Sequence, residues 1–131
     1  MPTFLGPYED KEFPNWEDLF MKNVSLVTVK LDFDSSPGPI SIGDLLPQYT
    51  NIFQIIIDIE SPFNGTPVLT IGNSVNVSEF MASDQVELSE TGLYAAFLFK
   101  ELQTSQIPLA YWNNTGVTTG SMKIMLMFSN P

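Results

Sequence analysis

Apolar and polar residues alternate along most of the chain from residue 24 onward, and Gly, Pro, Asn and Ser interrupt the alternation at intervals. A period of two residues predicts β-strands with one buried side, because successive side chains of a strand point to opposite faces of its sheet. The first such strand is predicted over residues 24–33, with Thr28, Lys30 and Asp32 on its polar side. Its apolar side comprises Val27, Val29, Leu31 and Phe33.

A second strand is predicted over residues 51–60, and both of its sides are partly apolar. One side carries Phe53, Ile55, Ile57 and Ile59. The other side mixes Ile52 and Ile56 with Gln54, Asp58 and Glu60. A strand that is apolar on both sides is typical of the centre of a β-sandwich or of a subunit contact.

Residues 66–128 form the longest block of extended segments, and the turns between these segments carry residue types that end strands. A strand is predicted over 75–81, and two later strands have apolar residues at every second position: Leu93, Ala95, Phe97 and Phe99, then Met122, Ile124, Leu126 and Phe128. The whole chain then has about eight strands at a spacing of roughly 8–12 residues. This pattern predicts an all-β fold, an antiparallel β-sandwich of the jelly-roll type.

The last strands are poor in charge, since only Lys100, Glu101 and Lys123 are charged between residues 92 and 131. Strands with so few charges either pair all their edges or bury part of their surface in an oligomer. We therefore expect these strands to form a subunit contact.

Residues 1–23 differ from the remainder, because five acids, three prolines and several aromatic residues occur there without a strand period. We predict an N-terminal arm over 1–23, irregular or partly helical, with one short helix capped by Asn15. One sandwich domain would then span 24–131. The apolar residues of the arm are candidates for binding a partner: Phe13, Trp16, Leu19 and Phe20. The alternative is an arm that folds back over one end of its own domain.

The charge balance excludes two classes of partner. Among the 131 residues there are five lysines, no arginine and fifteen acids, which gives a formal net charge of −10. A protein that binds nucleic acid or an anionic membrane surface needs a cluster of basic residues, and five dispersed lysines do not form one. No apolar run approaches the roughly 18 residues of a membrane span, and the first residues do not resemble a signal peptide. We expect a soluble chain that is made inside the cell.

The residue types present leave little room for catalysis or metal binding. The chain has no Cys and no His, which removes thiolate nucleophiles, imidazole bases and the usual zinc sites. Two pairs of acids share a strand side, and four more acids surround a predicted loop: Asp32 and Asp34, Asp58 and Glu60, then Glu79, Asp84, Glu87 and Glu90. Acids on the outward side of strands and on loops ordinarily face water, and no calcium-loop spacing is present. We predict no catalytic residue, no cofactor and no metal.

One group of residues has the composition of a sugar-binding site. Tyr111, Trp112 and Asn113 combine aromatic rings with an amide, and carbohydrate sites commonly use both. The alternative is that Trp112 ends a strand in the core or at a subunit contact.

Three segments of the second half carry a resemblance to a known group of proteins: PVLTIGNS, DQVELSETGLYAAFLF and LAYWNNTGVTTGSMKIMLMF. Together they resemble small jelly-roll virion proteins of tailed bacteriophages, which serve as head decoration (cement) proteins, head spikes or fibre tips. The resemblance implies a homotrimer that binds the major capsid protein or another virion protein. It also implies a location in the virion after synthesis in the host cytoplasm.

We therefore expect a non-enzymatic capsid decoration protein that forms oligomers and binds the head surface. The alternative is a tail-fibre or spike module that recognises a host surface carbohydrate.

Overall fold

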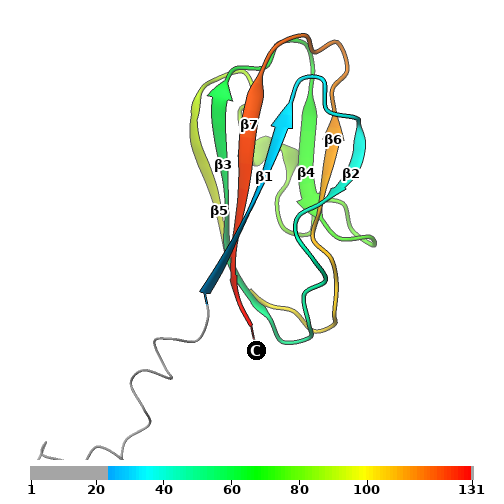
Figure 1. The fold of residues 1–131 in the computed structure, drawn as a ribbon, viewed down its shortest axis with the longest axis vertical. Coiled ribbons are helices and arrows are strands. Elements are labelled where there is room, and N and C mark those ends of the chain that lie inside the picture. Colours follow the sequence, from blue (N-terminus) through cyan, green and yellow to red (C-terminus); the bar gives the residue numbers. More distant parts are fainter. Residues whose placement is uncertain (1–23, 131) are drawn as a thin grey trace, which may run out of the picture.

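The computed structural model describes residues 24–130, which form two antiparallel β-sheets packed against each other (Figure 1). The larger sheet contains β1 (Val24–Asp32), β7 (Ser121–Ser129), β3 (Asn51–Ser61) and β5 (Gly92–Glu101), in that spatial order. The smaller sheet contains β2 (Gly38–Ser41), β6 (Leu109–Asn113) and β4 (Val68–Gly72). A 3₁₀ turn, η2 (Ser83–Gln85), precedes β5. The predicted arm and its helix at Asn15 lie outside the described residues.

Consecutive strands alternate between the two sheets along the whole described chain. As a result, no strand pairs with its neighbour in sequence, and every sheet contact joins distant segments. This connectivity and the two spatial orders are those of a jelly roll whose smaller sheet has three strands instead of four. The predicted antiparallel β-sandwich is confirmed.

The missing eighth strand corresponds to the segment predicted as a strand over 75–81. The side-chain oxygen of Asn73 accepts hydrogen bonds from the backbone N–H groups of Val75 (2.9 Å) and Asn76 (2.8 Å). A side chain that binds the following backbone in this way closes a tight turn and competes with a β-ladder. The chain then pairs with the free edge of β4 through one bridge, between Met81 and Ile71. Alternation alone therefore misidentified this segment, because Val75 and Val77 are exposed to solvent.

Strand β3 contains an irregularity that changes which residues face the core. The strand pairing shifts between Ile52 and Gln54 toward both neighbouring strands: relative to β7, Phe53 is an extra residue of β3, whereas relative to β5 the extra residue lies in β5, between Phe97 and Lys100. The predicted apolar side of this strand was wrong at Phe53, and Ile52 takes its place in the core. The Phe53 ring is half-buried instead, and its centroid lies 6.1 Å from that of Phe99.

The core fills the space between the two sheets and forms one continuous cluster. The inward residues of β7 are buried as predicted: Met122, Ile124, Leu126 and Phe128. The smaller sheet contributes Trp112, whose indole packs edge-on against Phe63 at a centroid distance of 5.3 Å. Strand β5 turns Ala96 toward the core, whereas the apolar residues noted in the sequence face outward: Leu93, Ala95, Phe97 and Phe99.

Gly120 provides a test of this packing. Its φ angle of +129° disfavours residues with a side chain, and a Cβ at this position would overlap the ring of Phe63, which is buried and backed by Trp112. We expect Gly120→Ala to lower the free energy of unfolding by about 2–4 kcal/mol, from backbone strain and overpacking together. Urea denaturation would measure this loss.

Gly116 is the matched control for that substitution. It has φ +71°, but an added Cβ would meet nothing within 4 Å. Gly116→Ala should therefore cost only the backbone term, about 1 kcal/mol. Equal losses in the two variants would contradict the packing described for Phe63.

Candidate functional site

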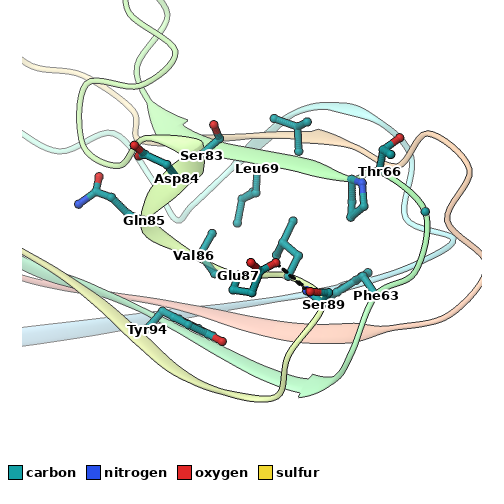
Figure 2. Close-up of a pocket in the computed structure, with 14 residues that line it drawn as sticks. Phe63, Thr66, Leu69, Ser83, Asp84, Gln85, Val86, Glu87, Ser89 and Tyr94 are labelled. Carbon is teal, nitrogen blue, oxygen red and sulfur yellow. Dashed lines mark hydrogen bonds between the residues drawn. The ribbon is translucent and has the colours of Figure 1, made fainter.

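The described residues form a pocket of about 600 Å³ at one open side of the sandwich (Figure 2). One wall is the segment that leads into β4, residues 63–69. The other wall is the segment 83–89, which follows the bridge at Met81. Tyr94 of β5 closes the pocket at the side of the larger sheet.

Backbone and side-chain hydrogen bonds hold both walls. The Asn64 side-chain oxygen accepts from the N–H groups of Thr118 (2.7 Å) and Thr119 (3.1 Å), which ties the first wall to the turn before β7. Between the two walls, the N–H of Phe63 donates to the carbonyl of Leu88 (2.9 Å). Val86 and Leu88 are buried and anchor the second wall to the core. The pocket is therefore pre-formed by the fold.

The polar side chains of the pocket are hydroxyls, two carboxylates and the amide of Gln85. The Ser89 hydroxyl donates to the Glu87 carboxylate (2.8 Å), as the dashed line in Figure 2 shows, and Asp84 lies on the same wall. The Tyr94 hydroxyl donates to the carbonyl of Glu90 (3.3 Å). A serine bonded to a carboxylate without an imidazole between them is not the arrangement that activates a nucleophile. The pocket can accept hydrogen bonds, but it offers no recognisable catalytic pair.

The acids considered in the sequence do not assemble into a site. Glu60 forms an ion pair with Lys123 at 3.4 Å, and Glu79 pairs with Lys100. Within residues 24–130, no group of three or more acids could hold a metal ion. In the same part of the chain, no helix is long and apolar enough to cross a membrane.

The sugar-site candidates are separated by the alternation of β6. Trp112 is only 2% exposed and lies in the core, where its ring nitrogen has no hydrogen-bond partner within the described chain. The Tyr111 hydroxyl donates to the carbonyl of Asn73 (2.7 Å). The Asn113 side-chain oxygen accepts from the N–H of Thr115 (3.1 Å). The indole therefore presents no face to solvent beside these polar groups. The arm candidates Phe13, Trp16, Leu19 and Phe20 lie outside the described residues.

The outward side of the four-stranded sheet carries an apolar surface, and two of its strands, β5 and β7, belong to the charge-poor stretch in which the sequence predicts a subunit contact. We call this outward side the outer face and define it by these residues: Val24, Leu26, Thr28, Lys30, Asp32, Phe53, Gln54, Ile56, Asp58, Glu60, Leu93, Ala95, Phe97, Phe99, Lys123, Met125 and Met127. The alternation in β5 revealed an apolar side. It could not reveal that this side faces away from the core, because Tyr94, Ala96 and Leu98 on the other side are apolar too.

Comparison with known proteins bears on the fold. No protein-family model and no curated protein matches the sequence. A chain in the acidic stable capsid structure of Helicobacter pylori bacteriophage KHP30 is similar in structure, with a TM-score of 0.66 and 10% identity, over 82% of this chain and 88% of that chain. A chain in the capsid asymmetric unit of cyanophage Pam1 has a TM-score of 0.59 and 14% identity, over 83% of this chain and 86% of that chain. Nearly the whole described domain thus shares its fold with chains found in phage capsids.

Proposed function

We propose that this protein is a non-enzymatic structural component of a phage virion, and specifically a decoration (cement) protein on the head surface. The observation that carries the proposal is the jelly-roll topology, which chains in two phage capsids share over more than four-fifths of this chain. The shared fold alone does not assign a role. The proposal gains support from the described pocket, which has no catalytic pair, and from an apolar outer face suited to protein contacts.

The proposal assigns separate roles to the two parts of the chain. The domain over 24–131 is the rigid body that covers the shell. It forms a homotrimer, as the family resemblance implies. The arm over 1–23 binds the major capsid protein or another virion protein. Its apolar residues supply that contact: Phe13, Trp16, Leu19 and Phe20.

A receptor-binding module for a host carbohydrate is the weaker candidate. Such a site needs an aromatic ring open to solvent beside hydrogen-bonding groups. Trp112 is buried, so the ring that suggested this function is not accessible. No other observation on the described residues favours it over the decoration role.

The decoration role predicts where the protein is found and in what amount. Mass spectrometry of purified particles of the encoding phage should detect the chain in a copy number comparable to that of the major capsid protein. A fibre or spike module would be present in far fewer copies. Absence of the chain from intact particles would refute the virion assignment itself.

The arm proposal predicts that attachment and folding can be separated. A chain lacking residues 1–22 should retain the circular dichroism spectrum and melting temperature of the full chain, because residues 24–130 form two paired sheets around a continuous core. It should fail to bind particles that lack the protein, whereas the full chain binds. In the full chain, Trp16→Ala with Phe20→Ala should reproduce the binding defect. Unfolding of the truncated chain would instead support an arm that covers its own domain.

A further inference from the structure

The outer face covers all four strands of the larger sheet, which stand side by side in Figure 1, and its apolar side chains are most exposed on the two edge strands. Its most exposed side chains are Leu93 (70%), Phe97 (68%) and Phe99 (72%) on β5, and Val24 and Leu26 on β1 are more than half exposed. Outward residues of β3 and β7 between them, Ile56, Met125 and Met127, are half-buried. A contiguous apolar surface of this kind on a soluble protein marks an interaction site.

The strand register arranges this face in three rows that cross the sheet from β1 to β5. The first row is Leu26, Met127, Gln54 and Phe97. The second row is Thr28, Met125, Ile56 and Ala95. The third row is Lys30, Lys123, Asp58 and Leu93.

Charge at the third row is divided between the two halves of the sheet. Both cations, Lys30 and Lys123, lie on β1 and β7, whereas Asp58 and the neighbouring Glu60 lie on β3. Lysines directly opposite each other on paired strands repel. Glu60 pairs with Lys123, but Lys30 has no ion pair within the described chain. Within the third row, the half formed by β1 and β7 is therefore positive and the half formed by β3 and β5 is negative, and two further acids, Asp32 on β1 and Glu60 on β3, follow this row, one on each half.

Phe99 lies at a bulge, because β5 has one residue more than β3 between the pair Gln54–Phe97 and the pair Ile52–Lys100. It has φ +46°, a conformation that a bulky residue adopts only at a cost on the order of 1–3 kcal/mol. Its ring is mostly exposed, so burial in the single chain does little to offset that cost. Contact with a partner would bury the ring together with the adjacent ring of Phe53.

We propose that the outer face binds the outer face of a second copy of this chain about a two-fold axis parallel to the strands, between β7 and β3. This axis places β1 over β5 of the second copy and β7 over β3 of the second copy, and it keeps every row opposite itself. Lys123 then faces Asp58 of the second copy, and Leu26 faces Phe97 of the second copy. The positive half of the charged row meets the negative half, and the apolar rows meet each other.

The size of the face determines the expected strength of this contact. Four strands about 4.8 Å apart, with about eight residues each at about 3.4 Å, span on the order of 500 Å² per copy. Two copies would bury on the order of 1,000 Å² in total, near the lower limit for a specific interface. We expect a dimer with a dissociation constant in the micromolar range. The high local concentration on a particle surface would favour its formation.

This contact goes beyond the proposed function, and the two can fail separately. An isologous contact closes after two copies, so it is distinct from the proposed association of three copies. With the two-fold contact alone the protein forms dimers, and with both contacts it forms hexamers. Particle composition tests the virion assignment and does not depend on either result.

The first experiment is sedimentation analysis of the full chain over a concentration series. We expect reversible association into even-numbered species. Phe97→Ser should weaken association at least about tenfold, because Phe97 faces Leu26 of the second copy in the first row. Val75→Ser is the matched control, since Val75 is 93% exposed on the loop after β4, away from this sheet, and should leave association unchanged.

The second experiment tests the axis by exchanging charges. Asp58→Lys alone sets two lysine side chains against each other across the axis, and Lys123→Glu alone sets two carboxylates against each other there. Each variant alone should associate about tenfold more weakly or worse, whereas an equimolar mixture should recover association because both contacts are attractive again. Repulsion within one chain cannot explain such recovery, because it is the same in the mixture as in each variant alone.

Three outcomes would overturn the proposal. The full chain could remain monomeric at its highest soluble concentration, or form only trimers. Phe97→Ser could leave association unchanged. The mixture of the two charge variants could associate no better than its components. Any of these would assign the outer face to another occupant, such as the chain's own arm or the capsid shell.

Discussion

The pairing of β3 with β7 is the constraint on which the remaining structure depends. It joins residues 51–61 to residues 121–129, and these two strands are the inner strands of the larger sheet. Their inward side chains form the centre of the core, with Ile55, Ile57, Ile124 and Leu126 inaccessible to solvent. Because each strand also pairs with an edge strand, β1 and β5 acquire their positions only once this pair exists. The jelly roll is thus assembled from contacts between distant segments, and no hairpin of adjacent strands can form it piece by piece.

The same constraint explains why the described residues form surfaces suited to protein contacts and no recognisable catalytic site. The two sheets fix their loops by direct hydrogen bonds, as Asn64 does with the turn before β7. Acids that could have formed a site pair with lysines or face solvent. What the fold leaves available is a broad sheet face with apolar rows, and such a surface is suited to protein contacts.

Sequence patterns predicted the strands whose two sides differ clearly. Strand β1 alternates valines with Thr28 and Lys30, and β7 alternates four buried residues with less buried ones, so the core side of each was readable. Other features escaped for local reasons. The Asn73 side chain accepts hydrogen bonds from the backbone of residues 75–76 and so prevents the eighth strand. The alternation of apolar and polar residues carries no information about these hydrogen bonds. The extra residue Phe53 reverses the side on which its neighbours fall. For the candidate site the limit is sharper, since only the position of β6 between two other strands shows that the Trp112 indole is buried.

The position of the lysines connects the fold to its assembly. All three lysines of the described chain lie on strands of the larger sheet, at Lys30, Lys100 and Lys123, although the whole chain carries a net charge of −10. Two such acidic molecules repel over most orientations, and the repulsion is weakest where local charges compensate. The third row of the outer face is such a place, because Lys123 of each copy opposes Asp58 of the other copy across the proposed axis. The acidic residues on the remaining surface would then repel a second copy in other orientations. This repulsion would make the weak contact between two outer faces specific.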